Sequence, residues 1–293
     1  MHQSFIKQLC DYFLEDEMRL ELLEALLNNA PLEGIGQVLF KGLTKCGLTL
    51  YTKDGLRLTK EGRIFANGVL GYPKFKKSGG LHAAKVGLSL FADHTFERCL
   101  DLGCGFGFST MEVCRYLEIK QAIGIDIESL AILLAKHFAS LEGFSNTRIF
   151  FANAKGEKLP FAGNSFDLIT AIRSLPYMNP FLALQEAARV MKPGAFGLLQ
   201  LHSPGLFIVQ LKKELRRCNL RSVAYNSIGV LNSIFLNISP FLKVLIIRNG
   251  VPSGQTKKGF ITLLKDYGLE LLGWFDSKDK FRPVVVLRKK PSA

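Results

Sequence analysis

One stretch limits the fold of this chain more than any other, the glycine-rich run that follows residue 98. It reads Cys-Leu-Asp-Leu-Gly-Cys-Gly-Phe-Gly-Phe-Ser-Thr and places Asp101 ahead of glycines at 103, 105 and 107. Apolar residues before the run predict a buried strand over 98–102, and the residues after it predict a helix over about 109–117. Glycine lets the backbone turn tightly and approach a ligand closely, and the helix N-terminus offers free N–H groups. The run therefore predicts a ligand-binding strand–loop–helix unit.

Strands and helices alternate on both sides of this unit. The predicted strands are 98–102, 121–126, 147–151, 166–172, 196–201, 269–275 and 283–288. The predicted helices between most of them are about 109–117, 129–141, 180–191 and 258–267. This alternation is typical of an α/β fold with a doubly wound, mostly parallel seven-stranded sheet.

Two further polar positions follow the glycine loop at the spacing of successive strands. Ala-Ile-Gly-Ile-Asp126-Ile127 is an apolar strand that ends in a carboxylate, which can accept hydrogen bonds from both hydroxyls of a ribose. A helix N-cap is the alternative role for Asp126, although Ser129 can also fill that role. Asn153 and Ala154 follow the next strand and lead into a Leu-Pro-Phe turn ending at Phe161.

Together these segments resemble the class I S-adenosylmethionine-dependent methyltransferases. The pattern D-x-G-x-G-x-G from Asp101 resembles motif I of that family, and the resemblance covers 98–201 closely and continues at 258–288. It implies a Rossmann-like sheet domain and S-adenosyl-L-methionine as cofactor. The cofactor-binding residues that it implies are Asp101, Gly103, Cys104, Gly105, Gly107, Asp126, Ile127, Asn153 and Ala154.

One position departs from the common family pattern, in which an aspartate reads the adenine amino group. Asn153 stands there instead. The adenine amine is a donor and an amide oxygen still accepts, so the same role stays open. A plain turn residue is the alternative for Asn153.

The sequence does not assign a catalytic side chain. Methyl transfer from a sulfonium is an in-line substitution that depends on positioning and on exclusion of water, and a base helps only a protonated nucleophile. Weak candidates lie where strands end, because ligands bind at the carboxyl ends of such sheets. His202 is a base near neutral pH or a solvated loop residue. Arg173 holds an anionic substrate or an acidic helix partner, and Tyr177 contacts substrate or packs in the core.

The first 70 residues form a separate predicted module. We expect a helix over 4–28, a second over 34–45, a hairpin around Asp54-Gly55 and a third helix from Thr59 to about 69. Helix, helix, hairpin, helix resembles a winged-helix module, which in small-molecule methyltransferases serves dimerisation or covers the substrate site. Residues 71–97 are predicted as a linker and lead-in helix, and 98–293 as the cofactor-binding domain.

A helical insertion is predicted at 205–250, directly after the fifth strand. It combines an apolar run around Leu206 with a basic cluster of Lys212, Lys213, Arg216 and Arg217. The predictions for it are a lid over a partly apolar substrate, an amphipathic patch that meets anionic membrane, or a packed helix pair with a solvated basic face. Pro240 and the charged residues near it favour a buried or surface-lying helical hairpin over a membrane span in this stretch.

The net charge and the cysteine pattern limit which classes of partner and which cellular compartment are expected. The net charge is +13, which attracts nucleic acid, acidic lipid or phosphorylated small molecules. The predicted second helix of the N-terminal module carries only Lys41 and Lys45, which disfavours a DNA contact.

Six cysteines without C-x-x-C pairs predict free thiols in a reducing cytoplasm and no metal site. An N-terminus without an apolar signal core predicts a cytoplasmic protein, peripheral to a membrane if the insertion meets lipid.

These observations favour a methyltransferase for a small, partly apolar acceptor that the sequence does not identify. The alternatives are a nucleic-acid methyltransferase and a non-catalytic S-adenosylmethionine-binding regulator with a DNA-binding N-terminal module. The sequence that follows strand four, Arg-Ser-Leu-Pro-Tyr, lacks the Asn-Pro-Pro-Tyr type of motif that an amino-methylating enzyme of nucleic acid would carry there.

Overall fold

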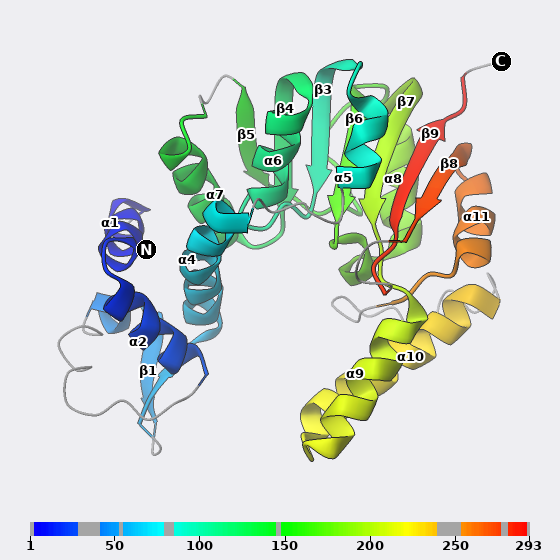
Figure 1. Cartoon of the computed structure of the whole chain (residues 1–293). Helices are drawn as coiled ribbons and strands as arrows, with labels where there is room; N and C mark the ends of the chain where they lie inside the picture. The colour runs from blue at the N-terminus through cyan, green and yellow to red at the C-terminus, as the bar shows by residue number, and fades with distance from the viewer. Residues whose placement is uncertain are drawn as a thin grey trace. The chain divides into compact units, whose positions relative to one another are not determined.

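The computed structural model describes residues 3–28, 42–52, 55–78, 85–144, 148–238, 253–276 and 281–291 of the 293 (Figure 1). Within these ranges it contains one seven-stranded sheet and one two-stranded hairpin. The predicted second helix at 34–45 lies largely outside the described residues, so the resemblance of the N-terminal module to a winged helix stays a prediction.

The large sheet confirms the predicted α/β class. Its strand order is β5-β4-β3-β6-β7-β9-β8. The first five of these pair in parallel, while β9 pairs antiparallel with both β7 and β8. The strand bounds are β3 Thr95–Leu102, β4 Glu118–Asp126, β5 Ile149–Asn153, β6 Phe166–Ile172, β7 Met191–Gln200, β8 Leu269–Phe275 and β9 Val284–Lys289.

The strands are apolar because both faces of a parallel sheet are covered. In β6 only Asp167 is not fully buried, and Val284 to Leu287 of β9 are all buried. The helices between and after the strands are α6 Phe108–Tyr116, α7 Ser129–Leu141, α8 Pro180–Val190 and α11 Lys257–Lys265. Each starts and ends within about two residues of its predicted position.

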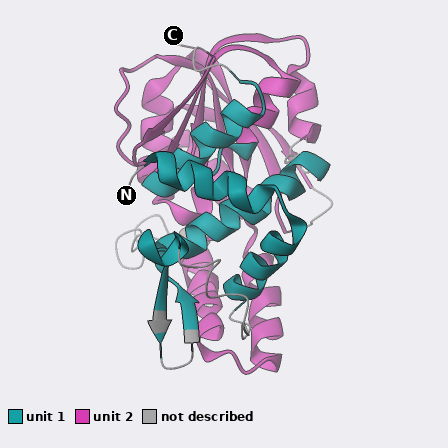
Figure 2. Ribbon diagram, turned by 90° about the vertical axis from the view of Figure 1, so that its left-hand side faces the viewer, with its two compact units in different colours: residues 1–80, 105–108, 128–145 teal, residues 81–104, 109–127, 146–293 magenta. Residues whose placement is uncertain are grey.

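The chain forms two compact units that interleave along the sequence (Figure 2). The first comprises 1–80, 105–108 and 128–145, and the second comprises the other residues, including the whole large sheet. The first unit contains α1 Gln3–Leu14, α2 Glu17–Leu27, the β1 Thr49–Thr52 and β2 Gly55–Leu58 hairpin, α4 Lys60–Ser78 and α7.

Two helix predictions in the first unit are wrong. The expected single helix over 4–28 is broken, because the Asp16 side chain accepts hydrogen bonds from the N–H groups of Met18 and Arg19 and caps a new helix there. The helix expected to end at about 69 continues to Ser78 with Pro73 inside it. Tyr72 and Phe75 on either side of the proline are buried, and this packing stabilises a helix that propensity alone would end.

An aromatic cluster explains why α4 continues. Within the first unit the ring of Tyr72 stacks on Phe138 of α7 with centroids 4.7 Å apart, and Phe75 stacks on Phe108 at 4.8 Å. The Tyr72 hydroxyl also donates to Glu142 at 2.6 Å. Asp11 of α1 and His137 of α7 form a further contact at 2.6 Å. Offset aromatic pairs add stabilisation beyond their buried area, so α7 is an integral part of this unit.

The predicted helical insertion is present as two adjacent helices, α9 Pro204–Arg216 and α10 Leu220–Ile238 (Figure 1). Residues 239–252 of the predicted insertion lie outside the described ranges. Within those ranges, none of the helices has the length and apolar character needed to cross a bilayer.

Candidate functional site

Asp101 is the penultimate residue of β3 and is buried against three hydroxyl groups. Its Oδ2 accepts from Ser109 at 2.9 Å and from Thr110 at 2.6 Å, and its Oδ1 accepts from Thr170 of β6 at 2.8 Å. Burial raises the pKa of the Asp101 carboxyl, while these hydrogen bonds act against that rise. The carboxyl is therefore directed into the protein, where it joins the first turn of α6 to two strands. Asp101 thus holds the start of α6, directly after the glycine loop, against β3 and β6.

The glycine loop needs glycine for two different reasons. Gly103, Gly105 and Gly107 all have left-handed φ angles, at 68°, 54° and 77°, which favour glycine. A Cβ on Gly103 would also lie 2.5 Å from the Cβ of Ser174, whereas a Cβ on Gly105 would meet nothing within 4 Å. Open space beside a strained backbone position is where a ligand can approach the main chain.

Cys104 joins the loop to the neighbouring strand. Its N–H donates to the carbonyl of Ile125 in β4 at 2.9 Å. Its side chain is buried, and burial raises the pKa of the thiol well above its ordinary value. Cys104 therefore contributes a backbone anchor and a neutral, unreactive thiol.

Asp126 and Asn153 stand opposite each other at the ends of β4 and β5. The Asn153 Nδ2 donates to the main-chain carbonyl of Asp126 at 3.0 Å and to that of Ile127 at 2.7 Å. The Ala154 N–H donates to the same Asp126 carbonyl at 3.0 Å. Two carbonyl acceptors require the amide nitrogen on that side, so the exposed Asn153 side chain has its Oδ1 left to accept from a ligand.

The structure thus brings Gly103, Cys104, Asp126 and Asn153 together at the ends of three adjacent parallel strands. Helix α7 begins at Ser129 with Glu128 as its N-cap, so Asp126 is not the cap of that helix. Ile127 follows with its side chain 57% exposed, which offers an apolar surface beside the polar groups. This set of groups suits a nucleoside. The carboxylate suits the ribose hydroxyls, the amide oxygen suits the polar edge of the base, and the apolar surface suits the face of the base ring.

The three catalytic candidates lie near one another after β6 and β7. His202 is buried, so the solvated-loop alternative is wrong. Its ring lies 5.7 Å from that of Tyr177 and 6.0 Å from that of Phe207. Tyr177 is 48% exposed, so the core-packing alternative is also wrong. Arg173 has a φ of 62°, an uncommon conformation for a side-chain-bearing residue. Burial, then the charge of Arg282, lowers the pKa of Arg173.

Several residues around these sites are not evident from the sequence motifs alone. Ser109, Thr110 and Thr170 hold Asp101, and the Ser-Thr pair directly after the loop was the signal for two of them. Tyr225 and Asn232 of α10 were overlooked as well. Tyr225 has its pKa raised to about 12, first by burial and then by Tyr177. Asn232 is a buried amide near the apolar end of a helix that also buries Asn226 and Ser233.

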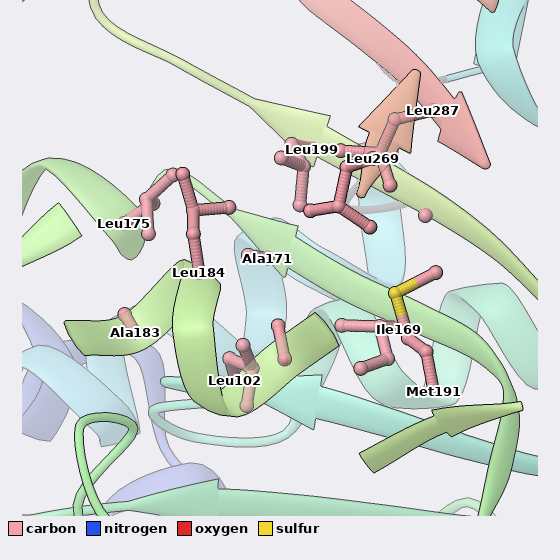
Figure 3. A pocket seen from close by; sticks show the side chains of 12 residues that line it. Leu102, Ile169, Ala171, Leu175, Ala183, Leu184, Met191, Leu199, Leu269 and Leu287 are labelled. Carbon is pink, nitrogen blue, oxygen red and sulfur yellow. The ribbon is translucent and has the colours of Figure 1, made fainter. Parts of the chain in front are cut away.

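A small cavity lies inside the hydrophobic core of the second unit and is unsuited to any substrate. Its volume is about 10 Å³, and Leu102, Ala171, Leu184 and Leu199 are among the side chains that line it (Figure 3). A space of this size holds at most one water, and an apolar lining gives a water no partners. The cavity is a packing gap between the sheet and its neighbours.

Comparisons with known proteins agree with this geometry. Residues 100–199 match the sequence profile of a family described as a methyltransferase domain. Over 120 residues the chain is 34% identical to a demethylmenaquinone methyltransferase of Porphyromonas gingivalis, a match that covers 40% of this chain and 47% of the relative. It is 28% identical over 158 residues to phthiotriol/phenolphthiotriol dimycocerosates methyltransferase 1 of Mycobacterium ulcerans, covering 52% and 55%. The chain therefore spans about half the length of the curated relatives it matches.

The solved structure of the YcgJ protein of Bacillus subtilis shares the fold. Its TM-score is 0.51 at 17% sequence identity, and the superposition covers 72% of this chain and 99% of that one. At this identity the likeness establishes the fold alone.

Proposed function

We propose that the chain, whose residues 100–199 match the profile of a methyltransferase domain, is a class I S-adenosylmethionine-dependent enzyme that transfers a methyl group to a small, partly apolar acceptor. The observation that carries this proposal is the fixed Asn153 amide beside Asp126 at the strand ends. S-Adenosyl-L-methionine supplies a methyl carbon that its sulfonium already activates. The protein has to bind the cofactor and the acceptor, orient them for methyl transfer and exclude water.

The residues present fit that cofactor. Asp126 would accept hydrogen bonds from the ribose hydroxyls, the Asn153 Oδ1 would accept from the adenine amine, and Ile127 would offer an apolar surface to the adenine. The main chain of Gly103–Gly107 would hold the amino-acid part of the cofactor, since Gly105 leaves open space there. Asp101 supports the loop through its three hydroxyl donors and makes no ligand contact in this proposal.

The acceptor lies, in this proposal, against the residues that follow β6 and β7. His202 and Tyr177 border that region and the α9–α10 pair covers it, as a lid would. The relatives act on demethylmenaquinone and on phthiotriol/phenolphthiotriol dimycocerosates, according to their names. The apolar side chains of α9 suit an acceptor with an apolar part.

The test is release of S-adenosylhomocysteine from S-adenosylmethionine by the purified protein, with a lipid extract and a random DNA duplex as separate acceptors. We expect acceptor-dependent release with the lipid extract alone. Release with duplex DNA would support the nucleic-acid alternative, and cofactor binding without release in either case would support the regulator.

We further propose peripheral membrane contact through the connection between α9 and α10, and a cytoplasmic location. Leu215 is 56% exposed and Leu220 is 81% exposed at this turn. Exposed basic residues surround them: Lys212, Lys213, Arg216, Arg217 and Arg221. Apolar side chains flanked by cations suit an anionic lipid surface.

Vesicle sedimentation tests this contact. Replacing Lys212, Lys213, Arg216 and Arg217 with Gln should reduce binding to vesicles that contain phosphatidylglycerol, and added salt should reduce parent binding because surface charge is screened. A matched control replaces the exposed Lys257, Lys258, Lys265 and Lys290 with Gln, which changes the net charge equally. Equal binding by the two variants would refute a specific role for the turn.

The N-terminal module is proposed to form a homodimer contact. Phe5, Tyr12 and Met18 on α1 and α2 are exposed apolar side chains, and Met18 is 62% exposed. Light scattering after size exclusion should give twice the chain mass for the parent and a monomer for Met18→Glu. A monomeric parent at every concentration would refute the contact.

A further inference from the structure

Two buried amide side chains near His202 have polar atoms without a hydrogen-bond partner within the described residues. Asn232 is 4% exposed, and neither its Nδ2 nor its Oδ1 has a partner in the part of the chain that the structure describes. Gln255 is 3% exposed, and its Oε1 likewise finds no partner there. A buried polar group without a partner is destabilising.

Backbone contacts place both amides beside the end of β7. The Gln255 N–H donates to the His202 carbonyl at 2.8 Å. The Gly254 N–H donates to Ser233 Oγ at 2.8 Å, and Ser233 is the chain neighbour of Asn232. One turn earlier in α10, a Cβ on Gly229 would lie 2.7 Å from the Phe207 ring. Asn232 and Gln255 therefore flank the start of α9 and the His202 segment.

The surroundings define the chemistry that these amides recognise. The rings of Tyr177 and Phe207 lie against His202 and supply aromatic surface. An amide both donates and accepts, so it pairs with a neutral hydroxyl or carbonyl. A site of aromatic walls with a few polar groups is typical of small-molecule pockets.

We infer that Asn232 and Gln255 bind a ring hydroxyl of the methyl acceptor, next to His202. This inference rests on the proposed methyltransferase function and adds the acceptor class, a neutral hydroxyl on an apolar ring. Without the acceptor, three amide atoms stay unpaired within the described residues: Asn232 Nδ2, Asn232 Oδ1 and Gln255 Oε1. The hydroxyl oxygen accepts from Asn232 Nδ2, and its one hydrogen is donated to one of the two amide oxygens. Such a site is specific because an analogue without the hydroxyl leaves the amides unpaired.

The first experiment measures the melting temperature of the protein without ligands. Asn232→Leu keeps the branching of the side chain and removes both unpaired atoms, so we expect an unchanged or higher melting temperature. Ser233→Ala is the matched control on the same helix, and it should lower the melting temperature because Gly254 loses its acceptor. A lower melting temperature for Asn232→Leu as well would show that the amide has a structural partner and would overturn the inference.

The second experiment compares 2-naphthol with 2-methylnaphthalene, which has a methyl group in place of the hydroxyl. The parent should bind 2-naphthol about tenfold more tightly, and Asn232→Leu and Gln255→Met should each reduce that preference. Equal binding of the two compounds by the parent would overturn the inference. S-Adenosylmethionine affinity is measured in parallel, and retained affinity shows that a failure concerns the acceptor site and leaves the cofactor proposal intact.

Discussion

The side-chain amide of Asn153 donates a hydrogen bond to the main-chain carbonyl of Asp126 at 3.0 Å. The same nitrogen donates to the carbonyl of Ile127 at 2.7 Å. This pair of contacts fixes which side of the amide faces outward, and it explains how asparagine can serve at the position where the family resemblance implies an aspartate. A carboxylate in the same rotamer would place an oxygen against two carbonyl oxygens.

Replacing Asn153 with Asp should therefore weaken cofactor binding in this chain. We expect S-adenosylmethionine affinity to fall by about 1–3 kcal/mol at neutral pH, because repulsion from the two carbonyls turns the side chain away. Titration calorimetry of Asn153→Asp beside Asn153→Ala measures the effect. Tighter binding by Asn153→Asp than by the parent would contradict the amide orientation.

Asp126 should accept hydrogen bonds from the ribose hydroxyls of the cofactor. Asp126→Ala should weaken cofactor binding by roughly 1.5–3 kcal/mol, the range for hydrogen bonds to a charged group. The control is Asp167→Asn in β6, whose carboxylate accepts from the N–H groups of Glu97 and Arg98 at the start of β3. This control should lower the melting temperature and leave affinity unchanged. Parent-like affinity in folded Asp126→Ala would refute the assignment.

The Gly105→Val variant tests whether the cofactor contacts the glycine loop. The branched side chain enters the space beside the loop, and the 54° φ adds backbone strain. Gly143→Val is the matched control, because Gly143 also has a left-handed φ, 76°, and nothing within 4 Å of an added Cβ. Both variants should lose similar stability, and calorimetry should show lost cofactor binding for Gly105→Val alone. Equal affinities would mean that the cofactor does not contact this loop.

Glu186 should stabilise the turn after β5 in a pH-dependent way. Its carboxylate accepts from Arg189 at 2.7 Å and from the Leu159 N–H at 2.7 Å. The Arg189 hydrogen bond, more than any other contact, holds the pKa of Glu186 below its ordinary value of 4.5. A lowered pKa in the folded state contributes stability above that ordinary value, and the contribution is lost as the pH falls through the folded pKa.

The corresponding variant is Glu186→Gln. It should lower the melting temperature by about 2–4 °C at neutral pH, as expected for the loss of about 1 kcal/mol. The difference from the parent should shrink below about pH 4, where the parent carboxylate also protonates. A difference that stays constant from pH 7 to about pH 3 would contradict the ion-pair explanation.

The sequence itself determined the elements of the sheet domain and their order. Helix α7 begins and ends at the predicted residues, and β6 has the predicted bounds. These features follow from the periodicity of apolar residues and from the positions of glycines, both of which are local properties of the sequence. The positions of Gly103, Asp126 and Asn153 at strand ends follow from the same local pattern, because parallel strands bring their carboxyl ends to one edge.

Only the tertiary structure decided how the side chains are used. Asn153 is oriented by carbonyls 26 and 27 residues away, and Asp101 is held by Thr170, 69 residues away. Helix α4 continues past Pro73 because Tyr72 packs on Phe138 of α7, and His202 is buried against Tyr177 and Phe207. Burial and hydrogen-bond pairing depend on residues distant in the chain, so no local pattern contains them.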